Sequence, residues 1–424
     1  MNGLSHAQRK LLDDLQADAF KYFVNEVNLK NGLVVDCTKA GWPSSIAAVG
    51  LALSVYPIGV ERGLISREEA LKRTLTTLRF FANSEHSTSG DATGYKGFYY
   101  HFLDMQTGRR VWECELSTID STFLLAGMLA AAAYFDWDSA DENEIRSLAD
   151  QLYRRADWKW AMNNVATVTH GWRPESGFLP YRWEGYDESL LLYVLGFGSP
   201  TYPLPVETYE ARTAKCQWKE IYAYEYLYAG PLFTHQYSHI WLDFRGIQDA
   251  FMREHGLDYF ENSRRATYVQ QEYARRNPNE WEGYSEVCWG LTACEGPGPK
   301  ELEIDGVKRV FFDYVARGVP DGPDDGTVAP WAVVASLPFA PEIVLPALGH
   351  FRETEVGKHP YGLEATFNTT FPEDQCRECG WLSPWHYGIN EGPIVAMIEN
   401  HSCASALISL TDCAAQDSLE AGSD

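Results

Sequence analysis

Helical segments of two kinds alternate along this 424-residue chain, and the alternation limits the fold more than any other feature. Residues 44–61 and 118–136 are apolar nearly all round, whereas residues 66–84 and 141–158 each carry a single apolar stripe. A helix with one apolar stripe lies at a surface, and a helix that is apolar on all sides is buried. The alternation therefore predicts an inner and an outer set of helices.

The same pattern continues to the end of the chain and predicts an all-α fold, an (α/α)6 barrel with six inner and six outer helices. The other inner segments are 187–197, 238–254, 327–338 and 391–410, and the other outer ones are 5–28, 208–228, 259–276 and 341–354. Ser66 with Glu69, and Ser139 with Glu142, have the spacing of capping boxes. Asp305-Gly306 predicts a small β-hairpin insertion near residues 302–315.

The chain shows no sign of a linker. Because no Gly/Ser-rich or Pro-rich stretch divides it, we expect one domain over residues 1–413 and a disordered tail over 414–424. The longest uncharged apolar run, Ser121 to Phe135, is too short for a membrane span. No apolar signal region opens the chain, so we expect a cytoplasmic protein, or a periplasmic one if an export signal has been removed. Oligomeric state is left open.

Composition favours a carbohydrate partner over a nucleic acid. The net charge of −24 argues against nucleic acid, which requires clustered Lys and Arg. The 14 Trp and 24 Tyr suit stacking on sugar rings, although composition alone favours an aromatic core. Cys376-x-x-Cys379 has no second Cys or His pair to complete a zinc site, so a disulfide or free thiols are favoured over zinc or redox chemistry.

Carboxylates gather with aromatic residues and glycines just before the predicted inner helices. Glu115 and Asp120 stand at the entry to one apolar helix, where helix capping is the alternative role. Glu188 opens another, LLLYVLGF, among Tyr181, Trp183 and Tyr186. Apolar walls raise the pKa of a carboxyl, as a general acid requires, and a simple helix-start carboxylate is the alternative. Glu391 precedes the last buried helix.

A third segment, PLFTHQYSHIWLDFRG, holds His235 and His239 four residues apart, with Asp243 four residues further on. This spacing would suit a metal on a helix, but hydrogen bonds to sugar hydroxyls are the favoured role, and satisfied core histidines remain an alternative. We therefore expect no metal and no cofactor. The predicted substrate-binding residues are Trp42, Tyr99, His101, Trp172, Trp183, Tyr186, His235, Gln236, His239, Asp243, Arg245, Trp331, Trp381 and Asn390.

No G-x-S-x-G elbow, P-loop or G-x-G-x-x-G motif is present, which leaves paired carboxylates and aromatics, the residues of glycoside hydrolysis. At these segments the chain resembles the glycoamylase-like domain family, which includes glycoside hydrolase family 144, the endo-β-1,2-glucanases, and a domain of cyclic β-1,2-glucan synthases. The matching strings lie between about residues 15 and 410 and read SIAAVGLAL, GFYYHFLD, ELSTID, GYDESLLLYVLGFGSP, PLFTHQYSHIWLDFRG, DGTVAPWA and GINEGPIVAMIEN.

The resemblance implies an (α/α)6 barrel and an inverting attack on β-1,2-glucosidic bonds, with Glu188 as the general acid. The base would be one of Asp120, Glu115 and Glu391. One departure affects the base: the family string GIDQGP reads GINEGP here, which moves the carboxylate from position 390 to 391. The expected function is hydrolysis of β-1,2-glucan or its oligosaccharides. The alternatives are a transglycosylase acting on the same glucan and a sugar-binding protein without catalysis.

Overall fold

The computed structural model describes residues 4–372 and 380–403. The predicted tail and Cys376 and Cys379 lie outside these ranges. The chain groups into two compact units. The first unit comprises Phe20–Cys216 and Tyr387–Gly392, and the second comprises Met1–Ala19, Gln217–His386 and Pro393–Ser405, in each case as far as these residues are described. Two helices, α1 (His6–Asn25) and α13 (Gly388–Cys403), contribute residues to both.

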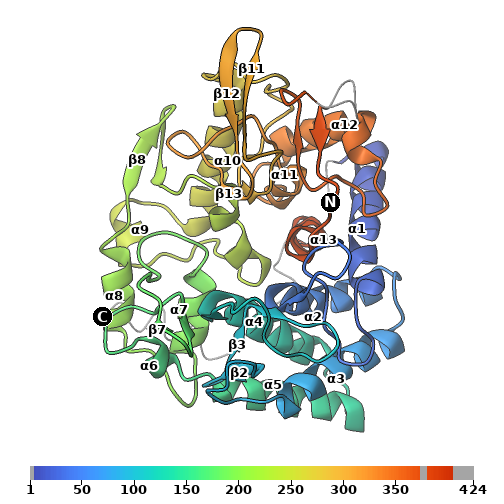
Figure 1. Cartoon of the computed structure of the whole chain (residues 1–424), viewed down its shortest axis with the longest axis vertical. Coiled ribbons are helices and arrows are strands. Elements are labelled where there is room, and N and C mark those ends of the chain that lie inside the picture. Colours follow the sequence, from blue (N-terminus) through green and yellow to red (C-terminus); the bar gives the residue numbers. More distant parts are fainter. Residues whose placement is uncertain (1–3, 373–379, 404–424) are drawn as a thin grey trace. The chain divides into compact units, whose positions relative to one another are not determined.

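Two buried helices form the centre of the first unit. They are α2 (Ile46–Glu61) and α4 (Thr118–Tyr134), which pack side by side (Figure 1). Glycines allow this close approach, because a Cβ on Gly50 would lie 2.3 Å from the Phe123 carbonyl oxygen and one on Gly127 would lie 2.0 Å from that of Gly50. The prediction that both segments are buried on all sides is confirmed.

Two amphipathic helices pack beside them, α3 (Arg67–Asn83) and α5 (Ala140–Arg155). Both begin as predicted, because the Ser66 hydroxyl accepts a hydrogen bond from the Glu69 N–H at 3.2 Å and the Ser139 hydroxyl one from the Glu142 N–H at 3.3 Å. Each places its apolar stripe inward, so the contrast between buried and striped helices that the sequence predicts is present in this unit.

Short strands in the first unit bring the segments before its helices together. A five-stranded sheet has the order β2-β3-β5-β6-β7, and a separate pair joins β1 to β4. The strands are β1 (Ser44–Ser45), β2 (Gly94–Tyr95), β3 (Phe98–Tyr100), β4 (Phe102–Leu103), β5 (Leu116–Ser117), β6 (Gly171–Arg173) and β7 (Gly177–Phe178). The remaining helices here are α6 (Trp158–Ala161), α7 (Leu190–Phe197) and α8 (Glu207–Thr213).

The second unit contains the amphipathic helix α10 (Tyr259–Arg276), the buried α11 (Pro330–Ala335) and α12 (Pro341–Glu353). The predicted hairpin is confirmed as β11 (Lys300–Ile304) and β12 (Val307–Phe311), drawn in orange in Figure 1. Its turn residues Asp305 and Gly306 have φ of 51° and 78°, the left-handed conformation that a tight hairpin turn requires. The other elements of the second unit are β8 (Trp218–Ile221), β9 (Tyr224–Leu227), η1 (Leu232–His235), η2 (Tyr237–Ile240), α9 (Ala250–Glu254), β10 (Ala293–Cys294), β13 (Val315–Ala316), η3 (Glu355–Gly357), β14 (Phe367–Asn368) and β15 (Trp381–Leu382).

Residues 208–228 do not form the single outer helix that the sequence predicts. The helix α8 ends at Thr213, and β8 pairs with β9 instead. Tyr222 and Ala223 make the turn with φ of 52° and 67°. Aromatic residues favour strands. The sequence did not predict this turn, because the turn lacks the Asn or Gly that usually adopts a left-handed conformation.

Residues 238–254 do not form the predicted inner helix either. Two 3₁₀ turns, η1 and η2, lead into a loop, and only the short α9 follows. The Asp243 carboxylate accepts a hydrogen bond from the Arg245 N–H at 3.1 Å, and Gly246 has a φ of 75°. Both features favour a turn over a continuous helix.

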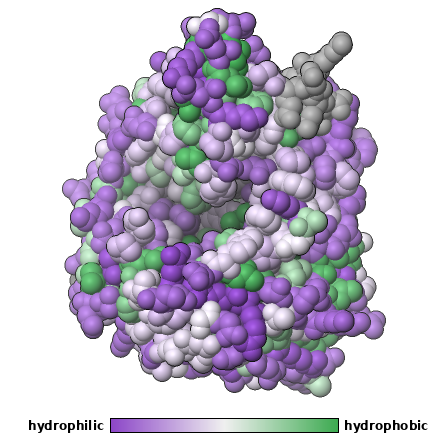
Figure 2. Space-filling model, viewed as in Figure 1, coloured by the Kyte–Doolittle hydropathy of each residue, from purple (hydrophilic) through white to green (hydrophobic). Residues whose placement is uncertain are grey.

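The described part of the chain is thus rich in helices, with several small sheets. None of the helices in the described ranges is both long and apolar enough to cross a membrane. Hydrophilic residues, in purple, cover most of the face drawn in Figure 2. This agrees with the strongly negative composition of the chain.

Candidate active site

Glu188 lies in the turn just before α7, two residues ahead of its first residue, Leu190. The neighbouring Trp183 is nearly buried and donates its indole N–H to the Thr118 hydroxyl at 2.9 Å. Thr118 is the first residue of α4, so this bond ties the Glu188 segment to the start of the helix that carries Asp120.

The pKa of Glu188 is raised to about 8, first by burial and then by the negative charges of Asp187 and Asp120, against the opposing effect of its own backbone N–H. The carboxyl therefore holds its proton at neutral pH. Since the charge of Asp120 contributes, the two side chains lie within electrostatic reach of each other. Burial therefore dominates the pKa of Glu188, as the sequence predicts, and the backbone hydrogen bond before the helix has a weaker, opposite effect.

Asp120, Glu115 and His101 form a connected cluster. The Nδ1 of His101 lies 2.8 Å from Glu115 Oε1, and its Nε2 lies 3.6 Å from Asp120 Oδ2. The pairing of Tyr99 with Ser117 between β3 and β5, extended by a hydrogen bond from the His101 N–H to the Glu115 carbonyl at 3.0 Å, holds the two segments in register. The Ser117 hydroxyl donates to Asp120 Oδ2 at 2.5 Å.

The charges in this cluster support one another. Burial alone would lower the pKa of His101, but the carboxylates of Asp120, Glu115 and Asp36 outweigh it and raise the pKa to about 9. Burial would raise the pKa of Glu115, but the hydrogen bond and charge of His101 and the nearby Arg173 lower it instead. His101 is therefore a cation at neutral pH, with the ionised Glu115 beside it.

Asp36 belongs to this cluster and was missed in the sequence. Burial raises its pKa to about 6, opposed by the charge of His101 and by the indole N–H of Trp42, which lies 3.2 Å from Asp36 Oδ2, and the charge of Asp120 raises it further. A signal was present, because the loop that carries Asp36 precedes a helix that is apolar on all sides, as does the segment that carries Glu115. The β1–β4 pairing, in which Ser45 faces Phe102, brings this loop to the residues around His101.

A cavity of about 770 Å³ opens beside Asp36, and Val35 and Cys37 on either side of that residue line it. Trp42 and Trp112 also line it, with their ring centroids 4.8 Å apart in an edge-to-face arrangement. Trp112 is 56% exposed, an unusual state for so large an apolar side chain. Trp42 was predicted as a sugar platform from the sequence and Trp112 was not.

The other predicted residues of the first unit differ in exposure. Trp172 on β6 is partly exposed, whereas Trp183 stacks on His170 with a centroid distance of 3.8 Å and is 6% exposed. Tyr186 is also buried. Tyr99 is fully buried, in contact with the rings of Phe81 and His86, so it offers no face to a sugar and is corrected here to a core residue.

Asn390 and Glu391 lie in the first turn of α13 and are both buried. The negative charge of Glu391 is one of several that, together with burial, raise the pKa of Tyr22. The Tyr22 hydroxyl in turn donates to the carbonyl of Val35 at 2.9 Å and to that of Asp36 at 3.1 Å. Glu391 is thus near the Asp36 loop.

Predicted residues of the second unit lie mostly in its core. His235 and His239 are buried, and burial is the main cause that lowers their pKa to about 4 and about 3. His239 Nε2 lies 3.0 Å from the Ser263 hydroxyl, and Gln236 donates to the Ala332 carbonyl at 2.7 Å. Both histidines therefore lie in the core, the alternative that the sequence left open, and His235 Nε2 is 3.1 Å from the Ala229 carbonyl.

The remaining four of these residues are divided between core and surface. Trp331 is buried at 2% exposure in α11 and is corrected to a core residue, because it has no face for a sugar. Trp381 on β15 is partly exposed. Arg245 is exposed over the Phe260 ring and lies 3.4 Å from the carboxylate of Asp243.

His235 and His239 do not form a metal-binding group with Asp243. Within residues 4–372 and 380–403, the geometry of a metal site appears at one group of three side chains, His359, Glu364 and His386 in the second unit. None of these three was predicted as a site residue. Their spacing, five residues and then twenty-two, gives no sequence signal.

Comparisons with known proteins agree on one family. Residues 180–410 match the Glycoamylase family, whose description is "Putative glucoamylase". A curated relative from Parabacteroides distasonis, "Exo beta-1,2-glucooligosaccharide sophorohydrolase (non-reducing end)", is 27% identical over 92% of this chain. The match covers 54% of that relative, so the chain spans about half its length.

Solved structures share the fold. A "putative glucoamylase" from Bacteroides uniformis superposes with a TM-score of 0.83 at 28% identity, over 97% of this chain and 95% of that one. An endo-β-1,2-glucanase from Chitinophaga pinensis, in complex with sophorotriose and glucose, gives a TM-score of 0.84 at 24% identity, over 98% and 97%.

Proposed function

This chain belongs to the Glycoamylase family, and from that premise we propose that it hydrolyses β-1,2-glucan or β-1,2-glucooligosaccharides with inversion at the anomeric carbon. The substrate named for the Parabacteroides distasonis relative supports this choice of linkage. The single observation that carries the proposal is the pairing of a carboxyl that stays protonated, Glu188, with an electrostatically coupled carboxylate, Asp120.

Glu188 acts as the general acid. A glycosidic bond breaks when a carboxylic acid protonates the leaving oxygen while a second carboxylate activates a water on the opposite face of the sugar. With a pKa of about 8, Glu188 carries the proton that this step needs at neutral pH. This assignment follows the GY-x-E string of the resemblance.

Asp120 is the base that the geometry supports best among the three candidates. The negative charge of Asp120 contributes to the raised pKa of Glu188. The charge of Glu115 interacts instead with His101 and Arg173, which lower the pKa of Glu115. The contacts of Asp120 with Ser117 and His101 both fall on Oδ2, so we assign Oδ1 to the attacking water. The imidazole of His101, whose Nε2 lies 3.6 Å from Oδ2, orients the Asp120 side chain. An inverting enzyme would place the two carboxyl groups about 6.5–9.5 Å apart.

The cavity beside Trp42 and Trp112 provides a sugar-binding subsite in this account. Flat indole faces stack on the apolar faces of glucose, and Trp and Tyr combine such a face with a polar edge. For the whole chain we propose the (α/α)6 barrel, with residues 1–413 as one domain. The shared fold with the solved structures and the contrast of buried with striped helices support it.

Glu188→Gln tests the proposal, because Gln keeps the shape of the side chain and removes the proton donor. Turnover of β-1,2-glucan should fall about 10²–10⁴-fold with folding and substrate binding retained. Glu184→Gln is the matched control: this exposed carboxylate is four residues earlier and accepts a hydrogen bond from the Thr167 hydroxyl at 2.9 Å. The control should hydrolyse as the unchanged protein does. Near-normal turnover by Glu188→Gln would refute the assignment.

A further inference from the structure

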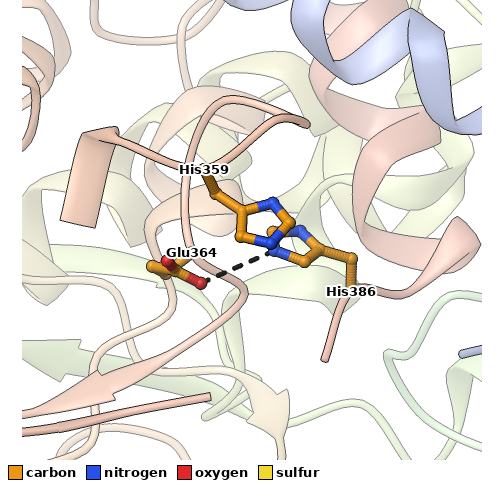
Figure 3. A group of neighbouring side chains, drawn as sticks. All are labelled: His359, Glu364 and His386. Carbon is orange, nitrogen blue, oxygen red and sulfur yellow. Dashed lines mark ion pairs between the residues drawn. The ribbon is translucent and has the colours of Figure 1, made fainter. Parts of the chain in front are cut away.

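A cluster of two imidazoles and one carboxylate lies in the second unit, where nothing in the proposed mechanism uses it. His359 and Glu364 lie in the loop after α12, and His386 lies between β15 and α13 (Figure 3). One ligand atom from each residue lies within 4.8 Å of the others. His386 is fully buried, and the side chain of Glu364 is 12% exposed.

Backbone hydrogen bonds hold the first two residues together. The Gly362 N–H donates to the His359 carbonyl at 2.8 Å, closing a tight turn that Gly362 completes with a φ of 102°. The Glu364 N–H donates to the Val356 carbonyl at 2.8 Å. The turn therefore fixes the separation of His359 and Glu364 before any ligand binds.

A strand pair brings in the third residue. In the β14–β15 ladder Phe367 faces Leu382, and the Ser383 N–H continues the pairing by donating to the Thr366 carbonyl at 2.9 Å. Following the same register, the segment around Glu364 lies opposite the segment around His386. The cluster is thus built from two chain segments that the fold already joins.

One pair of ligand atoms has the separation found between two ligands of one metal ion. Zinc binds nitrogen and carboxylate oxygen at about 2.0–2.2 Å, so two ligands of a tetrahedral site lie roughly 3.4 Å apart. His386 Nε2 lies 3.5 Å from Glu364 Oε2. The rings of His359 and His386 are stacked, with centroids 3.6 Å apart and 27° between their planes. Figure 3 shows the overlap, and one ring must rotate before both nitrogens point at the same ion. The widest separation between ligand atoms is at most 4.8 Å, so it would have to shorten by at most about 1.4 Å to reach that of a tetrahedral site.

The chemistry of the donors also favours a cation. Two imidazoles and one carboxylate offer the nitrogen and oxygen donors that zinc binds. One feature opposes binding at Nε2 of His359: the Tyr361 N–H lies 3.3 Å from Nδ1 and favours a proton on Nε2. At that length the contact is weak.

We propose that His359, Glu364 and His386 bind one zinc ion, with water in the fourth position. Two imidazoles and a carboxylate form a donor set that suits zinc and other first-row divalent ions better than calcium or magnesium. The ion ties the loop after α12 to the segment that leads into α13, and so stabilises the second unit. The sequence led us to expect no metal. With this site, that expectation would be wrong for the folded structure, whereas the acid–base chemistry would still need no metal.

Zinc titration of the chelator-dialysed full chain tests the site, with binding measured by calorimetry and unfolding followed by circular dichroism. The unchanged protein should bind one Zn²⁺ per chain, and its melting temperature should rise with Zn²⁺ concentration. His359→Gln and Glu364→Gln should each weaken Zn²⁺ binding about 10²-fold or more, beyond the roughly 10–100-fold loss caused by residues that only support ligands. Both residues are incompletely buried, so these variants avoid a fully buried substitution.

His350→Gln is the matched control, a partly exposed histidine on α12 in the same unit that lies outside the cluster. It should bind Zn²⁺ as the unchanged protein does. The proposal is overturned if the unchanged protein binds no Zn²⁺, which would make the cluster an imidazole–carboxylate pair only. It is also overturned if the two cluster variants bind Zn²⁺ as tightly as the control, since the ion would then occupy another site.

Discussion

A single imidazole, His101, is placed so that its charge acts on three carboxylates of the first unit. It contacts Glu115 and Asp120 and lowers the pKa of Asp36 from across the cluster. Glu188 lies outside its direct contacts and keeps a raised pKa. The site therefore combines the His101 cation and the ionised Glu115 with a protonated carboxyl, Glu188, and such a division of protonation states suits acid–base catalysis.

The pH dependence of hydrolysis follows from Glu188. Its pKa of about 8 lies above the ordinary value of 4.5, so the acid form persists through neutral pH and is lost as the pH rises through about 8. kcat/KM on β-1,2-glucooligosaccharides should fall on that alkaline limb. Asp187→Asn removes a negative charge that raises this pKa, so the limb should move to lower pH. An alkaline limb that stays in place or moves upward would argue against Glu188 as the acid.

Exposed tryptophans at the cavity should contribute to binding. Trp112→Ala should weaken oligosaccharide binding by about 1–3 kcal/mol, because stacking residues at the centre of a site carry much of its affinity. Trp137, which is 62% exposed elsewhere on the first unit, is the control, and Trp137→Ala should leave the dissociation constant unchanged. Calorimetric titration compares them, and equal affinities for the two variants would remove the cavity from the account.

At the scale of elements, the close contact of α2 with α4 depends on two glycines. Gly50→Ala should lower the free energy of unfolding by about 1–3 kcal/mol, because the new methyl group overlaps the α4 backbone. Gly349→Ala on α12 is the control: a Cβ there meets nothing within 4 Å, and the change should stabilise by about 0.4–1 kcal/mol. Urea unfolding measures both, and an unaffected Gly50→Ala would show that the two helices are not held in close contact.

Helices and strands were predictable where particular residue types mark their ends. Ser66 and Ser139 cap their helices as expected, and Asp305-Gly306 makes the expected turn, because these residue types have few other roles at such positions. The β8–β9 hairpin was not predictable, since its Tyr222-Ala223 turn uses residues that rarely adopt a left-handed conformation. Tertiary packing decides such cases, and local sequence does not record it.

For the site, the sequence supplied the residues but not their partners. Glu188, Asp120, Glu115 and Trp42 stood out as polar or aromatic residues at helix entries. Their coupling through His101 and Asp36 depends on strand pairings between segments far apart in sequence, which no local pattern shows. Burial likewise separated Tyr99 and Trp331 from the exposed Trp112 only once the fold was known.

At the scale of the whole molecule, the central prediction is that the chain hydrolyses β-1,2-glucan. Its alternatives differ in products. A hydrolase creates one new reducing end per bond cleaved, a transglycosylase redistributes chain lengths without a net gain of reducing ends, and a binding protein leaves the glucan unchanged.

Product analysis on linear β-1,2-glucan is therefore the most direct test, with reducing ends and chain lengths measured together over time. We predict a steady gain of reducing ends with progressive shortening of the chains, and first products of inverted anomeric configuration by NMR. Redistributed chain lengths at a constant number of reducing ends, or an unchanged glucan, would contradict the claim.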